Sequence, residues 1–175
     1  MRTLLIPLIL SLSLVTTCTQ CSTGQGIVDD INSRVQFRYA DLITQAHEAS
    51  HEIAAQLRSS LHKPAFYVLH GHYFTVEEPK TTLKEVAERI PLEKRGPLYG
   101  LYLVQAQKWW NDQPTYLIEE WCAYLAGAEV RKELGIKDRY ETVRFADEMA
   151  VYVSYLPMAD WTFYKTQMKR MEKLR

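Results

Sequence analysis

Small and apolar residues recur at helical spacing between residues 33 and 61, and this repeat is the strongest constraint that the sequence places on the fold. Intervals of three, four and seven residues put these positions on one face of a helix, which we expect to run from about Ser33 to Leu61. Pro64 marks its end. The positions on this face are Ala40, Ile43, Ser50, Ala54, Leu57 and Leu61.

Two histidines, His47 and His51, lie within this interior face. Residues four apart on a helix lie one turn above another, so both imidazoles point the same way and can bind one ion. Glu48 is rotated by one position, so it cannot bind that ion beside them, but it can reach a water molecule on it. The segment 47–51 therefore predicts a zinc-dependent hydrolase with two nitrogen ligands and a general base. The alternative is a pair of hydrogen-bonded histidines near the core, without a metal.

A catalytic zinc usually takes three protein ligands and one water, so a third ligand must come from elsewhere in the chain. The best candidate is Glu120, on a second predicted helix, in line with Tyr116 and Tyr124. Its neighbour Glu119 could instead be the third ligand. Otherwise Glu119 is a hydrogen-bond partner of a ligand or an exposed charge. A solvated acidic pair also remains open for these two residues.

The motif and a glutamate on a later helix together resemble the zincin metallopeptidases, specifically the gluzincin branch. This resemblance implies a zinc-bound water, Glu48 as base and later proton shuttle, and an oxyanion donor from a Tyr, His or Arg. Glu120-Trp121-x-Ala123 resembles the glutamate helix of the anthrax lethal factor catalytic domain. In that helix the residue four positions after the ligand is acidic, whereas here it is Tyr124.

A tetrahedral oxyanion needs a hydrogen-bond donor, and several tyrosines could supply it. The candidates are Tyr155 and Tyr152, on a late helix, and Tyr116, one turn before Glu120. Two further histidines, His70 and His72, lie in a predicted turn, where exposure to solvent is the more ordinary explanation.

The predicted fold is α+β, mainly α, a single zincin-like domain with one small β-hairpin. Phe66–Leu69 and Tyr73–Val76 form the hairpin, and Gly71 takes the positive φ of its turn. The hairpin either provides an edge strand that holds an extended substrate or simply covers the core. Capping and proline signals predict helices at Thr82 to before Pro91, Pro97–Trp110, Pro114–Leu134 with Gly135 as its C-cap, Asp138 to about Pro157, and Asp160–Leu174.

The N-terminal segment predicts export. Arg2 and the apolar run Leu4–Val15 fit a signal peptide over 1–21, since the run is too short to span a bilayer. A buried N-terminal helix is the alternative. Val15-Thr16-Thr17-Cys18 resembles a lipobox, which makes Cys18 a possible lipid anchor, although cleavage after Cys21 fits equally. Residues 22–32 then form a flexible leader before the domain at 33–175.

Composition narrows the range of partners. The 21 basic and 21 acidic residues balance and are interspersed, so nucleic acid is not expected as a partner. No later segment predicts a membrane span, and Cys122 is expected to be a buried thiol. The leading prediction is an exported zinc peptidase that acts on a peptide or protein. A non-catalytic zinc-binding domain and a helical interaction domain are the alternatives.

Overall fold

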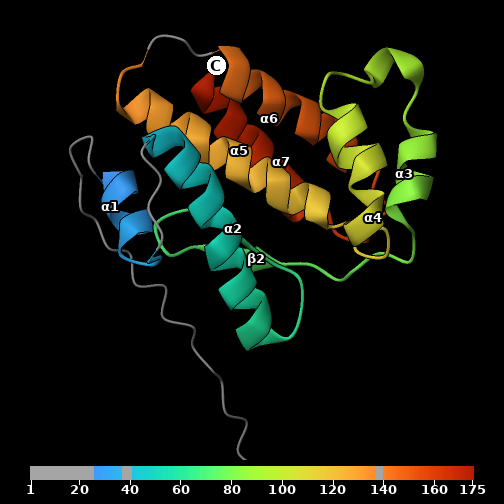
Figure 1. Ribbon diagram of the computed structural model, residues 1–175, viewed down its shortest axis with the longest axis horizontal. Coiled ribbons are helices and arrows are strands. Elements are labelled where there is room, and N and C mark those ends of the chain that lie inside the picture. Colours follow the sequence, from blue (N-terminus) through green and yellow to red (C-terminus); the bar gives the residue numbers. More distant parts are fainter. Residues whose placement is uncertain (1–25, 37–40, 137–139) are drawn as a thin grey trace, which may run out of the picture.

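One buried helix, α5 (Tyr116–Glu133), organises the computed structural model, which describes residues 26–36, 41–136 and 140–175. Helices α2 and α6 pack along α5, and α7 crosses its other side (Figure 1). The elements around α5 are α1 (Gly26–Asn32), α2 (Leu42–Leu61), β1 (Ala65–Tyr67), β2 (Tyr73–Thr75), α3 (Leu83–Arg89), the 3-10 turn η1 (Leu92–Lys94), the π-helical segment η2 (Gly100–Gln105), α4 (Gln107–Trp110), α6 (Tyr140–Val153) and α7 (Thr162–Leu174). The described residues thus form a mainly helical domain with one two-stranded antiparallel sheet.

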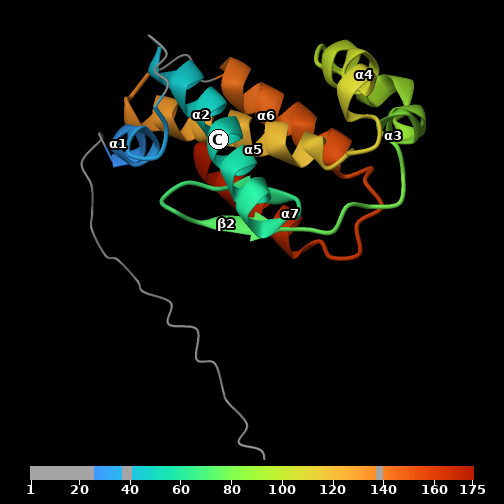
Figure 2. The same cartoon turned by 60° about the horizontal axis from the view of Figure 1, so that its bottom comes forward.

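The core has two parts, because α5 is buried on almost every side. The larger part joins α5 to α3, η2, α6 and α7 around the fully buried Trp121 and Tyr152. Cys122 is a free, buried thiol in this part, as predicted. The smaller part joins α1, α2 and the hairpin to the far end of α5 at Ala126 and Val130. Helices α3 and α4 form a corner at the end of the molecule opposite α1 (Figures 1 and 2).

Helix α1 differs from the flexible leader that the sequence predicts over 22–32. Residues 26–32 are helical, and Ile27, Val28 and Ile31 are buried in the smaller core. Spacings of three and four residues give α1 an apolar face, and packing against α2 and the hairpin stabilises a helix too short to form alone. Asp30 fixes α1 to the hairpin, since it accepts hydrogen bonds from the Tyr67 hydroxyl and the His70 backbone N–H.

Helix α2 begins nine residues later than the predicted start at Ser33 and ends, as predicted, at Leu61. Asp41 is its N-cap: the carboxylate accepts hydrogen bonds from the backbone N–H groups of Ile43 and Thr44. These bonds satisfy donors that have no partner within the helix. The predicted interior position Ala40, the cap at Asp138 and the signal peptide at 1–21 lie outside the described residues.

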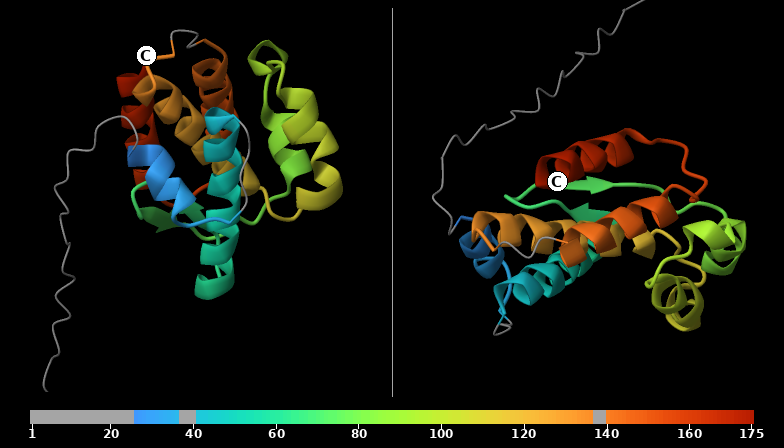
Figure 3. Two further views of the ribbon diagram at one scale, coloured as in Figure 1. Left: turned by 60° about the vertical axis from the view of Figure 1, so that its left-hand side comes forward. Right: turned by 90° about the horizontal axis from the view of Figure 1, so that it is seen from above.

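The hairpin confirms the prediction, with shorter strands. Phe66 pairs with Phe74 in the antiparallel register, and Gly71 has a φ of 76° in the turn. In Figure 3 the hairpin lies between α7 and the α2–α5 pair. Phe74 stacks on Phe163 of α7 at 5.1 Å between ring centroids, whereas Tyr67 belongs to the smaller core beside α2.

The predicted helix Pro97–Trp110 is confirmed in part: the segment is helical up to Trp110, but it divides at Ala106 into η2 and α4. Its start is held by Glu148 of α6, which accepts hydrogen bonds from the Leu98 backbone N–H (2.7 Å) and the Tyr152 hydroxyl. The Tyr152 hydroxyl in turn accepts a hydrogen bond from the Gly96 N–H (3.1 Å). A contact 50 residues away in sequence therefore sets where this segment begins. Helix α3 begins at the predicted capping box of Thr82 and Glu85, and Gly135, just after the end of α5, has a φ of 66°. Helix α7 begins at Thr162 with Trp161, not the predicted Asp160, at its N-cap position.

This anchor predicts a difference between two glycines of the same segment. A Cβ at Gly96 would lie 2.4 Å from the Glu148 carboxyl carbon, whereas a Cβ at Gly100 would meet nothing within 4 Å. We expect Gly96→Ala to displace the carboxylate from its donors and to lower the free energy of unfolding by about 1–3 kcal/mol. Gly100→Ala should be neutral or slightly stabilising. Urea denaturation followed by circular dichroism measures both, and equal stability of the two variants would rule out the anchor.

Candidate metal centre

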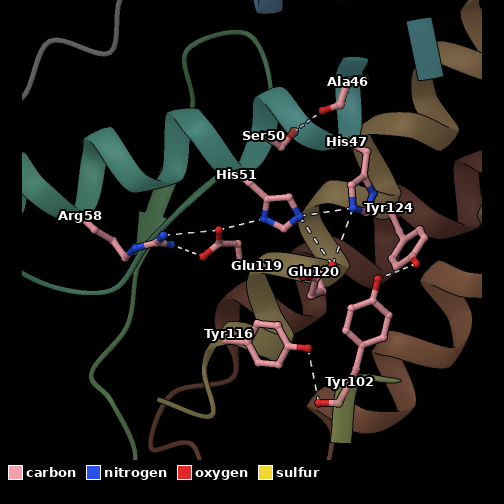
Figure 4. A network of polar contacts seen from close by, with 10 residues as sticks. All are labelled: Ala46, His47, Ser50, His51, Arg58, Tyr102, Tyr116, Glu119, Glu120 and Tyr124. Carbon is pink, nitrogen blue, oxygen red and sulfur yellow. Dashed lines mark hydrogen bonds and ion pairs between the residues drawn. The ribbon is translucent and has the colours of Figure 1, made fainter. Parts of the chain in front are cut away.

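Three predicted ligands meet between α2 and α5 (Figure 4). His47 and His51 project from successive turns of α2, and Glu120 faces them from α5. The two Nε2 atoms are 3.3 Å apart, and Glu120 Oε2 lies 3.7 Å from that of His47 and 3.6 Å from that of His51. The histidine side chains are 18% and 24% exposed, so they lie at the margin of the helix interface rather than in its interior.

The spacing of these atoms suits a small cation. Tetrahedral zinc with bonds of about 2.0–2.1 Å to nitrogen or oxygen would place its ligand atoms about 3.3–3.4 Å from one another. Two imidazole nitrogens and one carboxylate oxygen are a common catalytic zinc set, which leaves a fourth position for water. The residues present therefore fit a metal ion, and zinc is the ion that this donor set favours.

Glu119 orients one of the histidines. The His51 Nδ1–H donates a hydrogen bond to Glu119 Oε1 at 2.9 Å, which turns Nε2 toward His47 and Glu120. The other oxygen of Glu119 is paired with the guanidinium of Arg58, which lies two turns after His51 on the same face of α2. A carboxylate behind a ligating histidine fixes its tautomer and ring orientation. The sequence left open whether Glu119 or Glu120 is the ligand, and the geometry favours Glu120 as ligand with Glu119 behind His51.

Burial and charge act on the two imidazoles in opposite directions. Burial and the charge on His51 lower the pKa of His47 to about 4, which keeps its ring neutral. Burial alone would also lower the pKa of His51, but hydrogen bonds and charge from Glu119 and Glu120 raise it to about 10. The polar environment of His51 is therefore built for positive charge at this position, whether a proton or a metal ion supplies it.

Glu48 lies beside the centre, on the side of His47. Both residues line a pocket of about 220 Å³, together with Tyr124 of α5 and Phe145 of α6. The charge of Glu48 contributes to the raised pKa of Tyr124, after burial and after the carboxylate of Glu120. The pocket thus brings a carboxylate that is not a member of the ligand set to the open side of His47.

Three tyrosines surround Glu120. The Tyr102 and Tyr124 hydroxyls share a hydrogen bond of 2.8 Å, and the Tyr116 hydroxyl donates to the Tyr102 carbonyl at 3.4 Å. The ring of Tyr124 also meets that of His47 edge to face, with centroids 4.8 Å apart. Burial, followed by the Glu120 charge, raises the pKa of Tyr102 and of Tyr116, so both stay protonated and can donate.

The other predicted donors lie elsewhere. The Tyr152 hydroxyl donates to Glu148 within the anchor of η2, so it is committed to the fold. Tyr155 follows α6, is half-buried and packs against the larger core, and its catalytic role stays a prediction. His70 and His72 are exposed in the hairpin turn. Of the predicted donors, only Tyr116 lies close to Glu120.

Sequence reasoning missed Arg58 and Tyr102. Arg58 lies seven residues after His51, which is two turns along the same face of α2, so helical spacing alone places it near the partner of that histidine. No comparable signal points to Tyr102, because η2 is held near the site by contacts between residues that are distant in sequence, among them the anchor at Glu148.

Comparison with models of known protein families, with curated proteins and with solved structures found no significant match. No helix among the described residues is long and apolar enough to cross a membrane.

The two glutamates predict different losses of zinc affinity. Glu120→Ala removes a ligand atom, whereas Glu119→Ala removes only the group behind His51, a change that costs about 10–100-fold in affinity at comparable sites. We expect the loss for Glu120→Ala to be the greater of the two. Competition with a chromogenic chelator measures both affinities, and Glu172→Ala on the exposed side of α7 is the control. The reverse order would make Glu119 the ligand.

Proposed function

We propose that this protein is a zinc-dependent metallohydrolase, and that its reaction is the hydrolysis of peptide bonds. The observation that carries the proposal is the convergence of His47, His51 and Glu120 within zinc-ligand distance, in a chain where Glu48 adjoins His47. The resemblance of this motif to the gluzincin peptidases supports the choice of reaction. The hydrogen bond between His51 and Glu119 supports a site built for a metal rather than a chance cluster.

Glu48 is the general base in this proposal. A bound zinc ion supplies an activated water at neutral pH and polarises the carbonyl under attack. Glu48 would accept a proton from the attacking water and pass it to the leaving amine, a task that needs a carboxylate close to the ion but outside its ligand set. The shared pocket of His47 and Glu48 supports this role.

The Tyr102–Tyr124 pair is the best-supported oxyanion donor. Only one of the two hydroxyl protons is used in their mutual hydrogen bond, so the other can be donated to a substrate oxygen. Both phenols lie close enough to the Glu120 charge for it to raise their pKa values. Tyr116 is the second candidate, since its present hydrogen bond is long.

The hairpin has no part in binding substrate at the metal in this proposal. It packs against the face of α2 that carries Ala46, Ala49 and Ile53, whereas the histidines project from another face of the same helix. The pocket of about 220 Å³ beside Glu48 is the proposed place for a substrate side chain next to the scissile bond. Export and a lipid on Cys18 stay predictions from the sequence.

A polar network without a metal is the competing explanation. A doubly protonated His51 would donate a hydrogen bond to Glu119 and form an ion pair with Glu120, and Arg58 already neutralises part of the charge of Glu119. Such a site would hold α2 against α5 and catalyse nothing. Metal content separates the two explanations.

Elemental mass spectrometry on the purified full chain tests the metal. We expect about one zinc per chain, as for a site with three protein ligands, and little or none in the His47→Ala variant. The His62→Ala variant, which changes an exposed histidine after the end of α2, is the matched control and should retain zinc. A folded wild-type chain that binds no added zinc would leave the polar network as the explanation.

The role of Glu48 is tested by a substitution that preserves shape. Glu48→Gln should retain zinc and stability but lose hydrolysis of a fluorogenic peptide mixture by at least about 100-fold, because the amide cannot accept the proton. Glu52→Gln, one turn further along α2, is the control and should hydrolyse as the wild type does. Full activity in the Glu48→Gln variant would remove Glu48 from the mechanism.

A further inference from the structure

A second concave site runs along the outer edge of β2. This groove has a volume of about 630 Å³ and lies between β2, the segment that follows it and the start of α7. Among the residues that the structure describes, its lining includes none of the metal-centre side chains. The volume is in the range of about 300–1,000 Å³ that is typical of ligand sites.

One wall of the groove is an unpaired strand edge. In the antiparallel register Phe74 forms the hydrogen-bonded pair with Phe66, so the backbone groups of Tyr73 and Thr75 point away from β1. No hydrogen bond to these backbone groups is found within the described part of the chain. Such an edge is a template for a further strand, and a sheet of only two strands has most to gain from one.

The other wall is apolar, and its floor carries one polar group. Phe163 and Met158 line the groove on the side of α7. Gln167 is only 1% exposed, and its Oε1 accepts a hydrogen bond from Arg170 at 2.6 Å. Gln167 lines the groove, so a carbonyl group of a bound chain could accept a hydrogen bond from its amide nitrogen.

The charge of the groove has a single sign. Glu77 and Asp160 are exposed at its rim, Glu78 also lines it, and no Lys, Arg or His does. Complementarity therefore favours a cationic occupant. A second copy of this chain would bring the same acidic edge, and residues 3–25 of the chain contain no basic residue, so neither matches the groove.

We propose that this groove binds an extended peptide segment of another protein that carries Lys or Arg between apolar residues, by adding it as a third strand to β2. Main-chain hydrogen bonds to Tyr73 and Thr75 provide the pairing, and the apolar wall takes alternate side chains. Glu77 and Asp160 attract the basic ones. The site acts independently of the metal, so it holds or fails whatever the metal centre does.

Fluorescence anisotropy with a labelled peptide of alternating lysine and valine tests the proposal on the full chain. We expect saturable binding that weakens with salt, and no binding of the glutamate–valine counterpart. A lysine–valine peptide with N-methylated backbone should also fail, because it cannot pair with a strand. Hydrogen exchange should slow at Tyr73 and Thr75 when the first peptide binds.

Two double variants, each of which removes two negative charges, distinguish binding in the groove from general attraction between charges. Glu77→Gln with Asp160→Asn should weaken binding about three- to tenfold, since asparagine still caps the turn before α7. Glu88→Gln with Glu93→Gln, at exposed positions of α3 and η1, is the control and should bind as the wild type does.

Three results would overturn the proposal. One is no binding of the lysine–valine peptide, and another is equal binding by its N-methylated form or by the Glu77→Gln, Asp160→Asn variant. The third is a dimer in light scattering with Tyr73 and Thr75 already protected from exchange, which would assign the edge to a second copy of the chain.

Discussion

The close packing of α2 on α5 is the contact on which the candidate site depends. Small residues permit it: a Cβ added at Gly127 of α5 would lie 3.3 Å from the Ile43 side chain and 3.4 Å from the Ile43 carbonyl oxygen. Ser50 is buried on the α2 side, and its hydroxyl donates to the Ala46 carbonyl at 2.7 Å, so it needs no partner across the interface. Because the backbones come this close, histidine side chains from one helix reach carboxylates on the other.

This packing brings two acidic side chains into a place where a lone charge would be unfavourable. Glu119 and Glu120 have side chains that are only 11% and 12% exposed. Burying carboxylates costs several kcal/mol unless charge and hydrogen bonds offset it. Arg58 and His51 offset the cost for Glu119, whereas Glu120 faces two imidazoles that carry one positive charge at most. A divalent ion would complete the compensation, which is the physical reason to expect one there.

Part of this structure could be predicted from signals that are local in the sequence. Thr82 and Glu85 predicted a capping box, Gly71 and Gly135 predicted positive φ angles, and helical spacing predicted that His47, His51 and Glu120 could meet. What the sequence could not show depends on contacts between distant residues. Helix α1 forms because the hairpin and α2 cover its apolar face, and the segment that leads into η2 is held at Leu98 by Glu148 of α6. Tyr102 reaches Glu120 because distant contacts, with Glu148 and with α3, hold η2 in place.

The two glutamates of α5 differ because adjacent helical side chains are rotated by about 100°. That rotation directs Glu120 at the gap between the two imidazoles and Glu119 at the outer nitrogen of His51. The next residue along, Trp121, points to the opposite side and is buried against Tyr164 and Met171 of α7. One turn of α5 thus supplies a candidate metal ligand, the carboxylate that orients a second candidate ligand, and an anchor for α7. A shift of α5 by one residue along its axis would move Glu119, Glu120 and Trp121 away from their partners together. The apolar contacts of α5 and its acidic side chains therefore favour the same position of the helix.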